Sequence, residues 1–267
     1  TLSTPGAGLT VMAGGASATG GQIYLDHGIV TTGGVVTMRG TTLTGAGTIS
    51  TNGGAVDLQF TSSLNYNALV SSGGGAVTVS TPNSSINSLQ VQAGAGAISV
   101  SGRNGVLNTT IGGTGAVAVT SSNGGLNNNG VTGGTVTLQA ASSISNVSVN
   151  ASDRVDATST NSSISLNNRN SQPLRLGTVT AASSLSLSSD AGFVQAAGGL
   201  LTSPYVSLYG YQSGATFGSV AAPLSIASPR LSLSGMGAAA HVAFSGSPTL
   251  TQLAFEGTVA AIGASTV

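Results

Sequence analysis

The 267-residue sequence contains no cysteine, no lysine and no tryptophan. The lack of cysteine removes disulfides and thiolate metal sites from consideration, although it does not fix the redox compartment. Asp, Glu, Lys and Arg make up only 4% of the residues and the formal net charge is zero, whereas charged residues are roughly 25% of a typical globular protein. No basic surface for nucleic acid or for an anionic membrane is therefore expected.

Long apolar runs are also missing. No run of 18 apolar residues occurs, so neither a transmembrane helix nor membrane insertion is expected. Thr1 opens into turn-like sequence without a visible signal peptide, which indicates a mature form or an excised segment. Aromatic residues are only 4%, so many thin layers are more plausible than one thick core, while a mean hydropathy of +0.33 argues against disorder.

A short strand pattern led by glycine recurs along the chain. Examples are "GGAVDLQF" from Gly53, "GGAVTVST" from Gly74 and "GGTVTLQAA" from Gly133. The first apolar residue of each strand recurs at a nearly constant interval, at Val36, Val56, Val77, Ile98, Val117 and Val136. A sustained period of about 20 residues is the signature of a solenoid, so these six side chains are predicted to stack as an inward column.

Each interval carries two further apolar positions, which predict three short strands per coil. The second position holds Leu64, Ile86, Leu107, Leu126, Ile144 and Ile164, and the third holds Leu69, Val91, Ile111, Val131 and Val149. The sequence therefore predicts an all-β parallel β-helix of about 10–12 coils, in which stacked coils bury an apolar face that one coil cannot bury alone.

The prediction places one domain over residues 1–267, with its most regular coils at about 30–166. An enlarged loop is expected at about 167–184, followed by less regular coils over 185–267. After Val155 the next clear pair is Leu185 and Leu187, which lies further away than one regular interval, and Val206 and Leu208 follow. The regular period thus weakens in the second half of the chain.

These glycine-led strands, in a chain rich in Ser, Thr, Asn and Gly, resemble the repeats of filamentous haemagglutinin-type bacterial adhesins. Passengers of autotransporters contain similar coils. The resemblance covers about residues 30–166 and implies a right-handed β-helix at or outside the surface of a Gram-negative bacterium. It also implies an outer-membrane secretion partner and a host-cell or surface receptor. The Asn-Pro motifs of that family's secretion domain are not evident in this chain.

No arrangement of residues indicates catalysis. The acidic residues are scattered, and the stretch from Asp153 to Asp156, with Arg154 between them, suggests a local salt bridge at a coil corner. His27 and His241 are far apart and lack the spacing of metal ligands. We therefore expect a non-enzymatic protein with no catalytic residue, no cofactor and no metal.

The best candidate for a recognition surface is "PYVSLYGYQ" from Pro204. Strand alternation would turn Tyr205, Tyr209 and Tyr211 outward, where aromatic rings can stack on sugars or on a partner protein. The rings could instead cover a neighbouring loop, such as "NNRNSQPLRLG" from Asn167. Arg169 and Arg175 in that loop could help to bind an anionic ligand.

Three functions remain open. The first is the shaft of a bacterial surface adhesin that attaches to cells or surfaces. The second is a subunit of an extracellular filament or biofilm matrix fibre, in which copies of the chain pair end to end through open coil edges. The third is a β-helix that binds or cleaves a polysaccharide. All three place the protein outside the cell.

Overall fold

The computed structural model describes residues 1–14, 20–236, 239–245, 249–255 and 258–264. These residues form strands, bends and turns, and none belongs to a helix long and apolar enough to cross a membrane. They divide into two compact units, unit 1 (Thr1–Gly134) and unit 2 (Thr135–Val267). Parallel coils of about 20 residues, about 11 in all, make up a β-solenoid, which confirms the predicted all-β fold.

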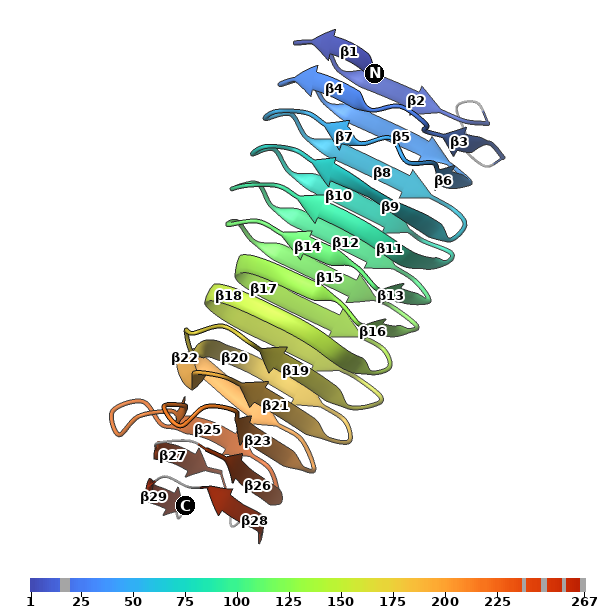
Figure 1. Cartoon of the computed structure of the whole chain (residues 1–267). Helices are drawn as coiled ribbons and strands as arrows, with labels where there is room; N and C mark the ends of the chain where they lie inside the picture. The colour runs from blue at the N-terminus through green and yellow to red at the C-terminus, as the bar shows by residue number, and fades with distance from the viewer. Residues whose placement is uncertain (15–19, 237–238, 246–248, 256–257, 265–267) are drawn as a thin grey trace. The chain divides into compact units, whose positions relative to one another are not determined.

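Unit 1 is built from short strands that pair in parallel with the strands of the next coil. They are β1 (Leu2–Pro5), β2 (Leu9–Met12), β3 (Gln22–Tyr24), β4 (Ile29–Thr32), β5 (Val36–Gly40), β6 (Thr42–Thr44), β7 (Ile49–Ser50), β8 (Val56–Phe60), β9 (Leu64–Ser71), β10 (Val77–Thr81), β11 (Ser85–Gln92), β12 (Ile98–Gly102), β13 (Gly105–Leu107), β14 (Thr110–Gly112), β15 (Val117–Ser121), β16 (Gly125–Asn127) and β17 (Gly130–Ala140), which runs into unit 2. Figure 1 shows β5, β8, β10, β12 and β15 side by side in chain order.

The first apolar position forms a vertical column inside unit 1. Val36 pairs with Val56, Val56 with Val77, Val77 with Ile98, and Ile98 with Val117. All five side chains are buried, and so is Val136 in unit 2. β-Branched residues suit this column because they pack well on a pleated surface and lose little freedom in an extended backbone.

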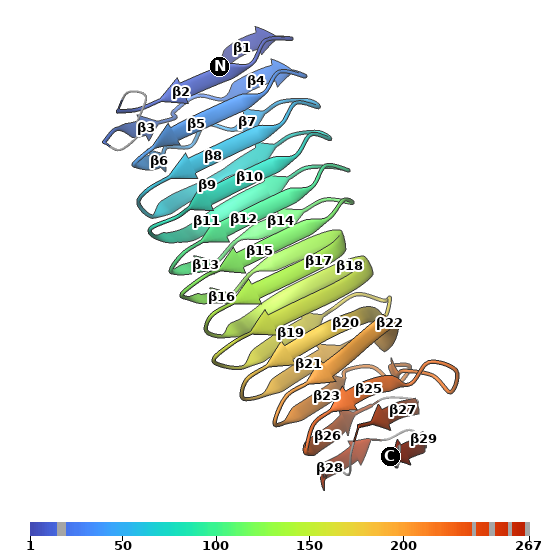
Figure 2. The same ribbon diagram turned by 180° about the vertical axis from the view of Figure 1, so that it is seen from behind.

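The second and third columns differ by one residue from the sequence prediction at two places. Val106, not Leu107, pairs with Ile86, and Val70, not Leu69, pairs with Val91. Leu69 and Leu107 are only partly buried. Val106 takes the place of Leu107 because the corner before β13 is one residue shorter than the corner before β11. Val70 takes the place of Leu69 because the pairing of β9 with β11 shifts register between Leu89 and Gln90. Figure 2 shows the second-column strands β9, β11, β13 and β16 stacked in order.

The corner before each first strand explains the recurring glycine pair. The buried hydroxyl of Thr31 donates to the carbonyl of Gly34 at 2.6 Å, and Thr51 and Ser72 donate in the same way to Gly54 and Gly75. A Cβ on Gly75 would overlap the carbonyl of Gly54 in the previous coil. Successive coils therefore approach so closely at this corner that only glycine fits.

Unit 2 continues the parallel pairing with longer strands. They are β18 (Ile144–Ser159), β19 (Ile164–Asn168), β20 (Leu174–Ala181), β21 (Leu185–Ser189), β22 (Gly192–Thr202), β23 (Val206–Gly210), β24 (Thr216–Phe217), β25 (Leu224–Ala227), β26 (Arg230–Gly235), β27 (Ala239–Phe244), β28 (Thr249–Phe255) and β29 (Thr258–Ala264). In both views β19, β21 and β23 lie side by side, in agreement with their register.

The regular interval continues past Val155, where the sequence analysis found no clear pair before Leu185 and Leu187. Val155 pairs with Leu176, one regular interval further on, while Leu185 pairs with Ile164 and so belongs to the second column. A bulge in β20 obscures this pairing in the sequence. Between Val155 and Ala157 the chain of β18 advances by two residues, whereas the paired residues of β20, Leu176 and Val179, are three apart. The enlarged loop expected at about 167–184 correspondingly narrows to residues 169–173, between β19 and β20.

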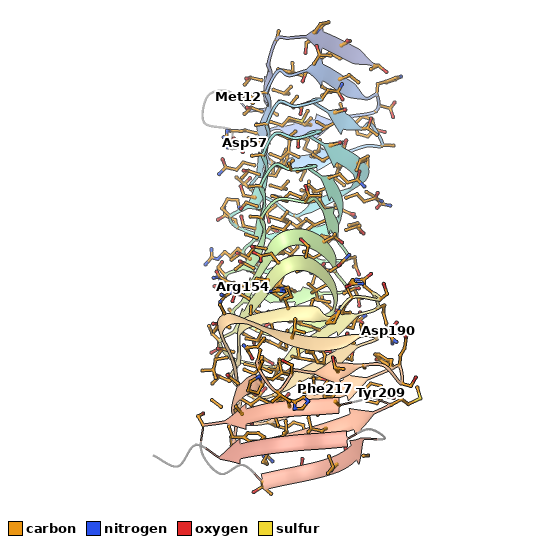
Figure 3. The ribbon with its side chains drawn as sticks, turned by 90° about the vertical axis from the view of Figure 1, so that its left-hand side faces the viewer. Met12, Asp57, Arg154, Asp190, Tyr209 and Phe217 are labelled. Carbon is orange, nitrogen blue, oxygen red and sulfur yellow. The ribbon has the colours of Figure 1, made fainter. Side chains whose placement is uncertain are left out.

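Four aromatic side chains are fully buried among the described residues, together with the aliphatic columns. Phe193 and Phe217 pack in unit 2 with ring centroids 5.4 Å apart, and Figure 3 shows Phe217 between the strands. Phe60 and Tyr66 are fully buried in unit 1. The tyrosine keeps its hydroxyl satisfied by donating to the carbonyl of Gly47.

Candidate functional site

The connection between β19 and β20, residues 169–173, is an enlarged corner of unit 2. We call it the 169–173 loop. Asn168 pairs with Ser189 and Leu174 pairs with Phe193 in the next coil. Five residues thus join the first pair of strands, whereas three residues, 190–192, join the second. The loop is two residues longer than its stacked neighbour, and functional residues often lie on such loops of a rigid scaffold.

A buried asparagine holds this loop in place. The Asn168 side chain is 2% exposed. Its Nδ2 donates to the Gln172 carbonyl at 2.9 Å, and its Oδ1 accepts from Asn170 N at 3.0 Å and from Asn170 Nδ2 at 2.8 Å. Both ends of the loop are therefore tied to one side chain, so the loop is an ordered feature.

At one end of the loop, Arg169 packs against Tyr211, which in turn contacts Tyr209. Its guanidinium carbon lies 3.4 Å from the centroid of the Tyr211 ring, and its Nη1 lies 3.4 Å from Asp190 Oδ1. Tyr211 and Tyr209 make an edge-to-face contact with centroids 4.7 Å apart. Figure 3 shows Asp190 and Tyr209 on one side of unit 2. Tyr211 thus packs against the neighbouring loop, while Tyr209 remains 38% exposed.

Tyr205 lies apart from this cluster. The guanidinium of Arg230 is 5.7 Å from its ring centroid, and Arg230 Nε donates to the Pro204 carbonyl at 3.5 Å. Of the three tyrosines that the sequence assigned to one outward face, the structure brings two together and places the third beside another arginine. Strand alternation predicts only that a ring points outward. Which residue the ring contacts depends on the side chains of the neighbouring coils.

At the other end of the loop, Arg175 lines a cavity of about 400 Å³, which we call the Arg175 cavity. Its main lining residues are Asn150, Ser152, Gln172, Pro173, Arg175 and Val194. Arg175 is exposed, and its Nε donates to the Asp153 carbonyl at 3.0 Å. Within the described ranges no carboxylate lies within ion-pair distance of it. The two loop arginines therefore differ, since Arg169 has an acidic partner and Arg175 has none.

Sequence reasoning named Arg175 as a possible anion ligand but did not name Asn150 and Ser152, which line the same cavity. These two residues lie on β18, one coil before the arginine, and only the coil register brings them beside it. Their alternation on either side of the buried Ala151 marks them as outward residues. That signal was available in the sequence, but it is common to every coil and so does not single them out.

The expected salt bridge beside Arg154 is present, but it lies on strand β18 and not at a corner. Arg154 Nε and Nη2 donate to the two oxygens of Asp156 at 2.7 and 2.8 Å. Asp156 Oδ1 also accepts from Thr178 N at 2.7 Å. Partial burial raises the pKa of Asp156, but hydrogen bonds from Arg154 and Thr178 and the charge of Arg154 outweigh it and lower that pKa.

The remaining ionisable groups form no cluster in the part of the chain that the structure describes. Asp57 pairs with Arg39 of the previous coil, and His27 is exposed at a distance from His241 in sequence. No group of three His, Asp or Glu side chains that could hold a metal ion occurs among these residues.

The chain's most distinctive local chemistry is therefore the 169–173 loop with the Arg175 cavity, set on a repeat scaffold. Comparison of the chain with models of protein families, with curated proteins and with solved structures gives no match.

Proposed function

We propose that the chain is a non-enzymatic, extracellular β-solenoid that forms the shaft of a bacterial surface adhesin. The observation that carries this proposal is the constant register between coils. In unit 1, equivalent residues from Val36 to Val117 pair in parallel at a nearly constant step along the sequence. A shaft needs this kind of repetition, because each added coil extends the stack by about 4.8 Å without a new core design.

The same register suits a load-bearing role. Strands β10 and β11 pair with the following coil along all three of its faces, through β12, β13 and β14. Tension along the stack would load these hydrogen bonds together and not one after another. Burial of the apolar columns protects the bonds from competing water.

The outward residues support a shaft more than a catalytic surface. The first strands present Thr37, Asp57, Thr78, Ser99 and Ala118 in register. Small polar side chains stack at this spacing without repulsion, whereas a column of lysines would place like charges about 5 Å apart.

The test is attachment by a bacterium that encodes the chain. Removing the codons for residues 36–116 puts Val117 in the place of Val36 and keeps the columns in register. This shortening should reduce attachment to host cells or surfaces, while the purified chain should release no reducing ends from polysaccharides. Unchanged attachment of the deletion strain, or hydrolase or lyase activity of the purified chain, would contradict the proposal.

A second candidate, a filament subunit, is favoured by the outermost strands. In the described residues β1 pairs only with β4 and β2 only with β5, so each has one edge without a strand partner. Leu2 is 50% exposed in unit 1, and Leu253 is 52% exposed in unit 2. Such edges can accept a further coil, from the same chain or from a second copy.

Electron microscopy of the purified chain separates the two candidates. Long fibres would support assembly, and single particles the shaft. Leu9 N already donates to the Val35 carbonyl, so ladder alternation turns Thr10 N toward the open edge. Thr10→Pro should therefore abolish fibres without changing the melting temperature, and fibres that persist in this variant would show that the β2 edge is not the contact.

A further inference from the structure

The Arg175 cavity has the size and position of a ligand site. Its volume of about 400 Å³ falls in the range of roughly 300–1,000 Å³ that is typical of small-molecule pockets. Three successive coils contribute to it, through β18, the 169–173 loop with the start of β20, and β22. The hydrogen bonds from Asn168 to Asn170 and Gln172 hold the 169–173 loop in place. The loop wall of the cavity is therefore ordered without a ligand.

The cavity carries one positive charge that is not neutralised by an ion pair. The Nε atom of Arg175 donates a hydrogen bond to the Asp153 carbonyl. Its two Nη atoms have no hydrogen-bond acceptor among the described residues. The nearby Asp153 carboxylate accepts from the Thr135 hydroxyl at 3.1 Å, and Arg154 is engaged with Asp156. The free edge of the Arg175 guanidinium is therefore available to bind a planar carboxylate.

Uncommitted polar side chains surround this charge. The side chains of Asn150, Ser152 and Gln172 are exposed and make no hydrogen bond within the described part of the chain. Amides and a hydroxyl both donate and accept, which matches the dual character of sugar hydroxyl groups. Pro173 and Val194 add apolar surface, against which the C–H face of a pyranose ring can pack.

We propose that the Arg175 cavity binds a carboxylate-bearing sugar of the hexuronate type. Arg175 holds the carboxylate, Asn150 and Gln172 hydrogen-bond the ring hydroxyls, and Pro173 and Val194 contact the ring face. A single guanidinium among neutral amides suits a monoanion better than a phosphate dianion, which usually draws several cationic or backbone donors. The inference is independent of the proposed shaft role, so failure of one leaves the other standing.

Ligand-observed NMR with the full chain tests this, with methyl β-D-glucuronide as the probe and methyl β-D-glucoside as its neutral match. The glucuronide should bind at least about tenfold more tightly, because only it can form the charge-assisted pair with Arg175. Arg175→Gln should weaken glucuronide binding about tenfold or more and bring it near the level of the glucoside.

Arg230→Gln is the matched control, because Arg230 also donates through Nε to a backbone carbonyl and lacks an acidic partner in the described residues. It should bind the glucuronide as the wild type does. Asn150→Ala changes an exposed side chain without a partner and should fold normally, with binding weakened severalfold; it keeps the test valid if Arg175→Gln is unstable.

Competition experiments with simple anions show whether the cavity recognises the sugar ring as well as the negative charge. Acetate and inorganic phosphate should displace the glucuronide poorly, since neither has a ring for the amides and the apolar surface. The proposal is overturned if either anion competes as well as free glucuronide, if Arg175→Gln binds normally, or if no glucuronide binding is seen at about 20 mM, where a typical weak sugar site is detectable.

Discussion

At the scale of single residues, space between coils determines which side chains are allowed. The glycine corner shows this most clearly, because Gly54, Gly75 and Gly96 each face the backbone of the coil before, at a distance that leaves no room for a Cβ. None of these three needs a positive φ. Their requirement is therefore steric, and it differs from the usual role of glycine in turns.

Gly75→Ala should destabilise unit 1 by about 1–3 kcal/mol, as expected for overpacking against fixed backbone. Gly112→Ala is the matched control, because a Cβ there meets nothing within 4 Å and no positive φ is required. It should be neutral or stabilising by up to about 1 kcal/mol, since alanine restricts the unfolded chain. Urea unfolding of both variants measures the difference; equal midpoints would show that the corner relaxes freely.

The ionisation of Tyr66 is coupled to folding. Its side chain is fully buried, and burial raises the pKa of the hydroxyl from 10.0 to about 12. The folded state therefore favours the neutral phenol. The stability from this effect is complete below pH 10 and is lost as the pH rises through about 12.

Tyr66→Phe should abolish this alkaline loss, because phenylalanine cannot ionise. At neutral pH it should cost about 1 kcal/mol, since the Gly47 carbonyl loses its donor. The free energy of unfolding, measured between pH 8 and pH 12 for both proteins, checks the prediction. An identical decline in the two proteins would mean that Tyr66 does not cause it.

At the scale of secondary-structure elements, strand pairing in unit 2 tolerates a bulge because side chains complete its hydrogen bonds. Thr178 lies where the pairing of β18 with β20 shifts, and the Asp156 carboxylate accepts its N–H. Arg154 holds that carboxylate and donates to the Ala197 carbonyl two coils further on, at 3.1 Å. The pair thus acts as a clamp on three consecutive coils of unit 2.

Asp156→Asn should weaken this clamp in a pH-dependent way. The pKa of Asp156 is lowered in the folded state, so its contribution to stability is present above the ordinary value of 3.8 and is lost as the pH falls through the lower folded value. The wild type should therefore exceed the variant in stability at pH 6 and approach it near pH 2. Asp26→Asn, at an exposed position without an ion pair among the described residues, should show no such convergence.

The elements also show how far sequence reasoning reaches. The Val77 and Ile98 column was predictable, because β-branched residues preceded by glycine repeat at a nearly constant interval. The place of Leu185 was not, because the bulge after Leu176 breaks the alternation and a corner of different length follows. The Arg175 cavity was predictable only in part: the irregular loop was visible, but its partners Asn150 and Ser152 depend on how two coils are aligned.

At the scale of the whole molecule, stability in a solenoid is close to a sum of coil and interface terms. Removing one complete coil should therefore be tolerated, whereas removing part of a coil should not. Residues 76–96 form such a coil in unit 1, because Val77 pairs with Ile98 and the glycine corner recurs at Gly75 and Gly96.

Deleting residues 76–96 joins Gly75 to Ala97, so that Ile98 takes the place of Val77 above Val56 and the apolar columns stay in register. The shortened chain should keep a β-sheet circular dichroism spectrum and unfold cooperatively, with a urea m-value lower by roughly a tenth because less surface becomes exposed. Deleting residues 76–85 instead joins Gly75 to Ile86, which moves second-column residues under the first column. Since every later pairing in unit 1 would then be out of phase, this variant should aggregate or unfold at a much lower urea concentration. If both deletions were tolerated equally, the columns could not be what aligns one coil with the next.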